Sequence, residues 1–169
     1  MAVDPHKWEM GCAGDAARNA FVIPTLVDLV RSLRPATIFD VGCGTGYIAR
    51  KVALELQSQP LSWTLLDRDS RMIDYAMRLL RDERFRFVVD DFLSLDTVLY
   101  SPHDMVLSCY STLEMASVST FALQTSKIVK PGGTLVVFVP DVLEDVIEAM
   151  KLNPGAIFEY RDGRYAINK

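Results

Sequence analysis

The chain has 169 residues, half of them apolar, and a formal charge of −4. A chain of this length buries roughly 70% of the surface that its unfolded form exposes, so it can build a core as one domain without disulfides or metal ions. The acidic balance argues against nucleic-acid and membrane partners, because both are usually bound by clustered Lys and Arg. We therefore expect a small-molecule partner.

The cysteines and the amino terminus bear on the compartment. Cys12, Cys43 and Cys109 show neither the C-x-x-C spacing of a zinc site nor the even count of a disulfide framework. The first residues lack a basic flank followed by an apolar stretch, and no apolar run approaches the ~20 residues that span a bilayer. We expect reduced thiols, no metal and a cytoplasmic location.

Helical patterns come first along the chain. Residues 1–14 show no clear period and are expected to lie over the surface or over a ligand. A short helix is predicted over 15–23. A separate helix is predicted from Pro24, a residue suited to the first turn, with an apolar stripe that reaches Leu33.

From Thr37 onward, short apolar runs rich in branched residues alternate with segments of helical spacing. The predicted strands are TIFDV (37–41), SWTLLD (62–67), FRFVVD (85–90), DMVLSC (104–109) and GTLVVFV (133–139). The predicted helices cover 47–56, 70–80, 118–129 and a segment that begins at Asp141. This alternation predicts an α/β fold with a doubly wound, mostly parallel sheet.

A glycine-rich loop, DVGCGTG, follows the first predicted strand and precedes a predicted helix. Glycines at such a position let the backbone turn sharply and approach a ligand beside a helix amino terminus. The spacing departs from a dinucleotide fingerprint, because Tyr47 stands where the third glycine belongs. Asp67 ends the second strand 21 residues beyond Gly46, near the distance at which an acid reaches ribose hydroxyls. A ribose-bearing ligand is expected.

Five segments in order, DVGCGTG, LLDRD, VVDDF, DMVLSCY and VKPGGTLVV, resemble the motif series of class I S-adenosylmethionine-dependent methyltransferases. The resemblance covers about Thr37 to Asp141. It implies a Rossmann-like core over 35–169 behind an N-terminal helical lid over 1–34, together one structural domain. It also implies S-adenosylmethionine as cofactor, S-adenosylhomocysteine as product, and methyl transfer to a small molecule by direct displacement.

The resemblance further implies which residues hold the cofactor. Asp67 would accept hydrogen bonds from both ribose hydroxyls, and Arg68 stands where relatives carry an apolar residue against adenine. Asp91 would bind the adenine amino group and Phe92 would line its pocket, the alternatives being a solvated acid and a core residue. The residues expected along the methionine part and the sulfonium are Asp40, Gly42, Cys43, Gly44, Gly46, Ser108 and Cys109.

The sequence identifies no general base. The candidates are Tyr110 and Glu114, just beyond the fourth strand, and His6 if the amino-terminal segment folds over the site. His103 precedes the fourth strand, so we expect a structural histidine at the amino end of the sheet.

The amino-terminal segment resembles the lid of small-molecule relatives. Within it, Arg18 would meet the cofactor carboxylate and Trp8 would wall the acceptor pocket, beside Asp15 and Asn19. The alternative is an ordinary amphipathic helix with solvated charges.

Two other functions remain open on the sequence. One is methylation of RNA or protein, although the loop after the fourth strand lacks the Asn-Pro-Pro-Tyr or Asp-Pro-Pro-Tyr tetrapeptide of relatives that methylate adenine or glutamine. The other is a catalytically silent domain that only binds cofactor or a partner.

The carboxyl-terminal segment looks short for this family, whose sheet ends in a long antiparallel hairpin. Residues 153–169 are expected to supply one strand at most, or a very short hairpin that turns at Gly163. The fifth strand would then be a bare apolar edge, which proteins normally cover. We expect either a truncated chain or a homodimer or partner chain that covers this edge.

Overall fold

The computed structural model describes residues 3–95, 100–110, 118–139, 157–161 and 164–168. The chain divides into two compact units, 1–138 and 139–169. The boundary expected at residues 34 and 35 lies inside the first unit and stays a prediction. In the described part, no helix combines the length and apolar character needed to cross a bilayer.

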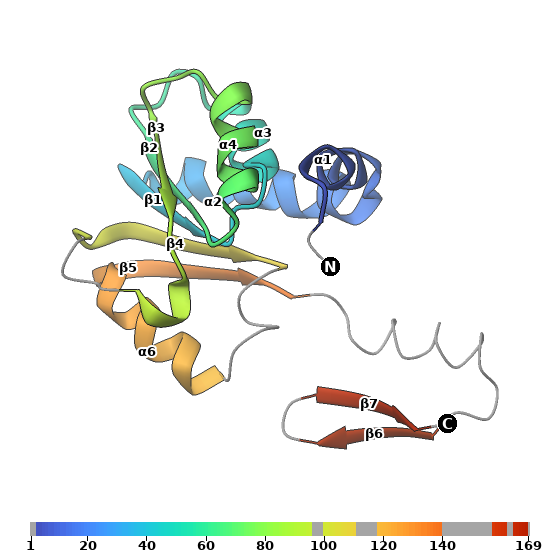
Figure 1. The fold of residues 1–169 in the computed structure, drawn as a ribbon. Coiled ribbons are helices and arrows are strands. Elements are labelled where there is room, and N and C mark those ends of the chain that lie inside the picture. Colours follow the sequence, from blue (N-terminus) through green and yellow to red (C-terminus); the bar gives the residue numbers. More distant parts are fainter. Residues whose placement is uncertain (1–2, 96–99, 111–117, 140–156, 162–163, 169) are drawn as a thin grey trace. The chain divides into compact units, whose positions relative to one another are not determined.

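The first unit alternates helices and strands (Figure 1). Its helices are α1 (Pro5–Gly14), the π-helix η1 (Arg18–Val22), α2 (Ile23–Leu33), α3 (Tyr47–Glu55), α4 (Ser70–Leu79), the 3₁₀ turn η2 (Phe92–Ser94) and α6 (Val118–Ile128). Its strands are β1 (Thr37–Val41), β2 (Ser62–Asp67), β3 (Phe85–Val89), β4 (His103–Cys109) and β5 (Val129–Phe138).

The five strands form one parallel sheet in the order β3-β2-β1-β4-β5. The predicted doubly wound parallel sheet is confirmed. In the register, Asp40 lies opposite Leu65 of β2 and Leu107 of β4. Because the strand order reverses at β1 and β4, the carboxyl ends of these strands border the crevice where such sheets bind ligands.

Two apolar clusters cover the faces of the sheet. Alternate β1 residues divide between them: Ile38 packs with α2 and α3, whereas Phe39 packs toward α6. Trp63 and Leu65 of β2 join the first cluster, and Leu66 joins the second. Figure 1 shows α6 on the opposite side of the sheet from α2, α3 and α4. Both faces are buried, which is why the strands read as nearly continuous apolar runs.

Residues 1–14 show no clear period in the sequence, yet Pro5–Gly14 is an α-helix within the segment for which the resemblance implied a helical lid, and the lid role stays a prediction. Asp4 caps it by accepting a hydrogen bond from the backbone N–H of Lys7, and Pro5 occupies its first turn. The residues that α1 buries are Glu9 and Cys12. Neither is a large apolar residue, so the sequence of α1 shows no clear stripe of large apolar residues at helical spacing.

The expected break at Pro24 is also wrong. Helical backbone runs without interruption through η1 into α2, and the backbone N–H of Ile23 donates to the carbonyl of Arg18. Proline lacks an N–H, and Pro24 falls in the first turn of α2, where the chain passes from π-helix to α-helix. Pro24 is therefore accommodated within a continuous helix and does not start a new one.

The second unit contains an antiparallel pair, β6 (Ile157–Arg161) and β7 (Arg164–Asn168), with Glu159 opposite Ala166. The expectation of one strand at most is wrong, and the short hairpin that was its alternative is what forms. Two residues between the strands suffice for a hairpin connection. The helix expected from Asp141, like Gly163, lies outside the described residues.

Candidate active site

The glycine loop 42–46 is held to the end of β2 by backbone bonds. The carbonyl of Leu66 accepts hydrogen bonds from the N–H groups of Gly42, at 2.8 Å, and Cys43, at 2.9 Å. The N–H of Gly46 then turns back to the carbonyl of Cys43, at 3.0 Å. Gly42, Gly44 and Gly46 all have positive φ, between 56° and 71°. The loop therefore needs glycine for its conformation, as predicted.

Two of these glycines also lie too close to neighbours for a side chain. A Cβ on Gly46 would lie 2.8 Å from Cδ1 of Leu80, and one on Gly44 would lie 2.8 Å from Nε1 of Trp8. The indole of Trp8, on α1, thus rests against the bare backbone of the loop. This contact places the expected lid residue beside the expected cofactor loop.

Asp67 binds the loop through one carboxylate oxygen and the backbone after β2 through the other. Its Oδ2 accepts a hydrogen bond from the N–H of Gly44, and its Oδ1 accepts one from the N–H of Asp69, both at 2.9 Å. Each carboxylate oxygen has a second lone pair. Asp67 can therefore still accept from ribose hydroxyls, a role that stays a prediction. Arg68, next to it, is exposed.

Asp40 is buried at the carboxyl end of β1. Burial, together with the nearby charge of Asp67, raises the pKa of Asp40 to about 7. A carboxyl group so placed is half ionised near neutral pH and favours a positively charged ligand.

A small cavity of about 20 Å³ opens at this edge of the sheet. It is lined by Trp8, Cys12, Arg18, Asp40, Gly42, Cys43, Tyr47, Ile48 and Cys109. All three cysteines of the chain therefore meet here, although they come from α1, the loop and β4. Burial raises the pKa of each thiol, so the thiols stay protonated and act as small apolar walls.

Arg18 reaches this cavity from η1. Its guanidinium lies 5.2 Å from the ring centroid of Tyr110 and pairs with Asp15 at 3.4 Å, while its Nε has no partner among the described residues. Asn19 donates to the carbonyls of Cys12 and Asp15. These bonds join the end of α1 to η1, and the roles expected of this segment as a lid stay predictions.

Glu9, Thr45 and Arg50, which the sequence did not single out, join α1 to the loop and to α3. Glu9 of α1 is buried and accepts a hydrogen bond from Oγ1 of Thr45 at 2.6 Å. It also accepts one from Nη2 of Arg50 on α3. In addition, Oη of Tyr47 donates to Asn19. A buried acid in a helix without an apolar stripe has no local sequence signal.

The remaining cofactor candidates are placed as follows. Asp91 caps η2 by accepting from the N–H of Leu93 at 3.0 Å, and Phe92 is buried with its ring 5.6 Å from that of Phe121. Phe92 thus contributes to the core, and its adenine role stays a prediction. Ser108 is buried, and its Oγ has no partner among the described residues.

Of the base candidates, the structure describes Tyr110 and His6, and they have different neighbours. Tyr110 lies at the end of β4 with φ 51°, and its N–H donates to the carbonyl of Phe138. His6 instead bonds Oη of Tyr75 on α4, at 3.2 Å. Glu114 lies outside the described residues. His103 lies at the amino end of β4, as expected, and its Nε2 is 3.1 Å from Oγ1 of Thr64.

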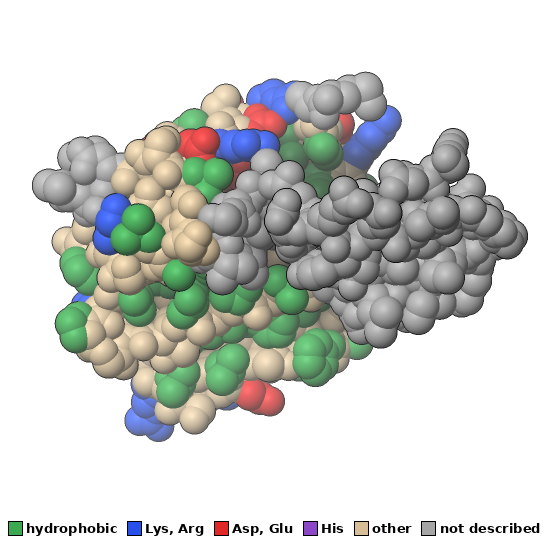
Figure 2. Space-filling model, turned by 90° about the horizontal axis from the view of Figure 1, so that it is seen from below, with side chains coloured by type: hydrophobic (Ala, Val, Ile, Leu, Met, Phe, Trp, Pro, Cys, Tyr) green, Lys and Arg blue, Asp and Glu red, His purple; other side chains and the backbone are tan. Residues whose placement is uncertain are grey.

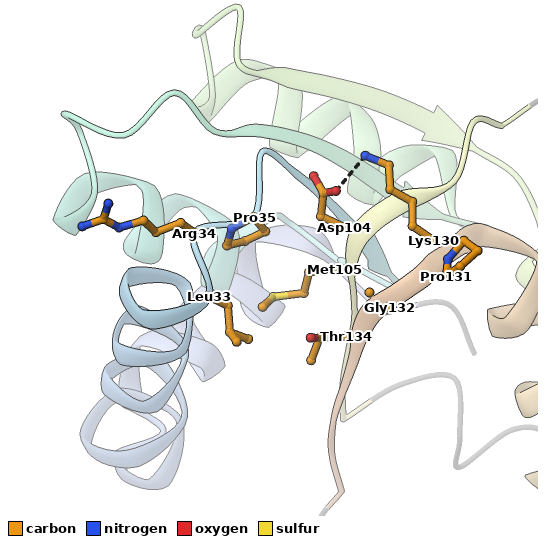
Figure 3. Close-up of a pocket in the computed structure, with 10 residues that line it drawn as sticks. Leu33, Arg34, Pro35, Asp104, Met105, Lys130, Pro131, Gly132 and Thr134 are labelled. Atoms are coloured by element: carbon orange, nitrogen blue, oxygen red, sulfur yellow. Dashed lines mark hydrogen bonds and ion pairs between the residues drawn. The ribbon is translucent and has the colours of Figure 1, made fainter.

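A larger cavity, of about 270 Å³, lies at the amino ends of β4 and β5, away from the glycine loop (Figure 3). Its acid and its lysine, Asp104 and Lys130, face each other at 2.7 Å. Asp104 also accepts from Thr37 and from the N–H of Ala36. Asp104 and Lys130 thus use their charges in bonds between β4, β1 and β5. Among the described residues, no group of three acids, histidines or cysteines could hold a metal.

Comparisons with known proteins agree with this geometry. A family model described as "Methyltransferase domain" matches residues 38–133, more than half of the chain. A malonyl-[acyl-carrier protein] O-methyltransferase of Hahella chejuensis (strain KCTC 2396) is 29% identical over 112 residues, which are 66% of this chain and 39% of that protein. The chain thus spans well under half the length of this curated relative.

Solved structures share the fold. A SAM-dependent methyltransferase from Aquifex aeolicus matches with a TM-score of 0.63 at 15% identity, over 98% of this chain and 96% of that one. The DszA carbon methyltransferase matches with a TM-score of 0.64 at 24% identity, over 76% of this chain and 38% of that one. With the family model and the parallel sheet, these likenesses show that the chain belongs to the class I methyltransferase family.

Proposed function

We propose that this protein is an S-adenosylmethionine-dependent methyltransferase that transfers a methyl group to a small-molecule acceptor. The observation that carries the proposal is the loop 42–46, whose three left-handed glycines face Asp40 and Asp67 at the strand-order reversal of the sheet. In such folds this edge is the ligand crevice.

The residues at the crevice fit an adenosyl ligand. Asp67 keeps free lone pairs for ribose hydroxyls, and the indole of Trp8 lies against Gly44. Asp40 is a buried acid with a like-charged neighbour, so a cationic group would favour its ionised form. The unpartnered Oγ of Ser108 offers a further donor or acceptor at the end of β4.

The bound cofactor would supply a methyl group already activated on a positively charged sulfur. Because the methyl group is activated, orientation and exclusion of water can supply much of the acceleration. Trp8 and the three thiols provide apolar walls for that purpose. Burial raises the pKa of Tyr110, so its hydroxyl stays protonated at neutral pH and orients an acceptor by donating a hydrogen bond.

Two observations favour a small acceptor. The curated relative acts, by its name, on an acyl group carried by a protein, with oxygen as the methylated atom. The chain itself is acidic, which disfavours binding to RNA. Incubation of source-cell extract with tritiated S-adenosylmethionine should give a labelled small molecule with the wild-type protein and none with Gly44→Arg.

Calorimetry with S-adenosylhomocysteine tests the cofactor assignment. Asp67→Ala removes the acceptor for both the loop and the ribose, so we expect binding to weaken at least tenfold, since hydrogen bonds to charged groups contribute about 1.5–3 kcal/mol. Asp28→Asn, an exposed change on α2, is the matched control and should bind as wild type does. Absence of heat with the wild-type protein would refute the assignment.

We also propose that a second copy or another protein covers β5, which pairs only with β4 among the described strands. Leu135 and Val139 are exposed along this segment, and Phe21 lies exposed against Phe138. Figure 2 shows hydrophobic side chains gathered on the face seen from below. Light scattering across a range of concentrations should reveal association, and a strict monomer would contradict a homodimer.

A further inference from the structure

The contact between α1 and the glycine loop is made by a buried charge. Glu9 is only 9% exposed and accepts from the hydroxyl of Thr45, which is itself fully buried, and from the guanidinium of Arg50. These three residues lie on α1, in the loop and on α3, respectively. An ionised carboxylate is costly to bury unless it is paired and hydrogen-bonded. Glu9 satisfies both conditions only when α1 is seated on the loop.

The rest of α1 offers little to hold it there. Besides Glu9, its buried residue is Cys12. Its other described contacts are the indole of Trp8 against Gly44, the bond of His6 to Tyr75, and the bonds from Asn19 to carbonyls near its end. Helices are usually held by an apolar stripe. The seating of α1 therefore depends unusually strongly on the polar cluster around Glu9.

The cluster acts on the ligand-binding part of the loop. Thr45 stands between Gly44 and Gly46, so a hydrogen bond from its side chain restrains a segment whose glycines would otherwise permit many conformations. Trp8, the residue before Glu9, packs its indole against Gly44. One carboxylate thus fixes both the loop and the aromatic wall beside it.

We propose that Glu9 is a positioning residue that, through Thr45 and Arg50, holds the glycine loop and Trp8 in the conformation that binds an adenosyl ligand. The inference rests on the proposed function and deepens it, since it assigns part of the cofactor affinity to a residue that does not line the cavity. Preorganisation of a binding loop improves affinity because less ordering is required on binding.

The test compares Glu9→Gln, Thr45→Val and the double variant, each by calorimetry with S-adenosylhomocysteine. Thr45→Val removes a hydrogen bond to a charged group and Glu9→Gln removes the charge that pairs with Arg50, so each single variant should bind about tenfold more weakly. The effects of the two substitutions should be less than additive in the double variant, because both act on the same contact. Thr45→Ser, which keeps the hydroxyl, should restore binding. Met10→Gln, on the exposed side of α1, is the control and should bind as wild type does.

A second readout does not need the cofactor. Of the two tryptophans, Trp63 is buried in the core and Trp8 is partly exposed, so acrylamide quenching of fluorescence reports mainly on Trp8. Glu9→Gln should raise this quenching and Met10→Gln should not.

The outcomes separate this inference from the proposed function. If the wild-type protein binds no S-adenosylhomocysteine, the proposed function fails, and quenching alone decides whether Glu9 holds Trp8. Unchanged quenching in Glu9→Gln would overturn the inference. So would a variant that melts at a lower temperature but binds the ligand with wild-type affinity, because Glu9 would then be structural only. If Glu9→Gln does not fold, the comparison of Thr45→Val with Thr45→Ser carries the test.

Discussion

Among single residues, the candidate site contains a buried acid and glycines with positive φ, both of which cost free energy in the folded chain. Asp40 is buried beside the like charge of Asp67, and the glycines of the loop adopt positive φ with neighbours in close contact. Strain and perturbed acids concentrate at functional sites because the ligand benefits from them. Both features can be tested by one substitution each.

For Asp40, the folded protein binds a proton more tightly than the unfolded chain does, because the pKa rises from 3.8 to about 7. Stability is therefore lost as pH rises from about 4 to 7, while the unfolded chain is ionised and the folded one is not. Asp40→Asn should be more stable than wild type at pH 8, and this advantage should shrink toward pH 4. Urea unfolding at several pH values measures it, and a pH-independent difference would contradict the assignment.

For Gly46, a side chain must adopt φ 71° and meets Cδ1 of Leu80 at 2.8 Å. We expect Gly46→Ala to lower the free energy of unfolding by about 2 kcal/mol, from backbone strain and local overpacking. Gly11→Ala is the matched control, because a Cβ there meets nothing within 4 Å and alanine favours a helix. An equal change in the free energy of unfolding of the two variants would contradict this expectation and show that the loop has room to relax.

At the scale of elements, the sheet and the site use opposite ends of the same strands. At the amino ends, Asp104 joins β4 to β1 through Thr37 and to β5 through Lys130. At the carboxyl ends, the loop after β1 is held by backbone hydrogen bonds to the carbonyl of Leu66 on β2. The first group of contacts should therefore affect stability, and the second should affect ligand binding.

Asp104→Asn tests the first of these statements. The bond from Lys130, with those from Thr37, lowers the pKa of Asp104 to about 2. The ionised form stabilises the fold above pH 4, and the contribution is lost as pH falls toward 2. We expect a loss of about 2 kcal/mol at pH 7 that narrows between pH 4 and 2. Chemical unfolding measures it, with affinity for S-adenosylhomocysteine unchanged. A weakened affinity would mean that the two ends are coupled.

At the scale of the whole molecule, the fold gathers residues that are far apart in sequence. Cys12, Cys43 and Cys109 lie on α1, the loop and β4, and they line one cavity beside Arg18 and Asp40. The predicted helices and strands alone did not indicate that these thiols meet. Their convergence supplies a probe for the site.

Because burial raises the pKa of both thiols, Cys43 and Cys109 should react only slowly with N-ethylmaleimide in the native protein, and a cofactor bound here should slow that reaction further. At a concentration ten times its dissociation constant, S-adenosylhomocysteine should slow modification about tenfold, in proportion to the free protein that remains. Mass spectrometry of timed samples gives the rates. In urea, all three cysteines should react equally with and without ligand. Unprotected thiols in the saturated native protein would place the ligand elsewhere.

The parallel sheet, the glycine loop and the position of Asp67 could be predicted from the sequence, because period and spacing are local properties of the chain. The hairpin of β6 and β7 was an open alternative, since short strands carry weak patterns. The contact by which Glu9 seats α1 on Thr45 became visible only in the folded structure. That contact joins residues 36 positions apart through a single buried charge, and a polar contact of this kind leaves no period in either segment.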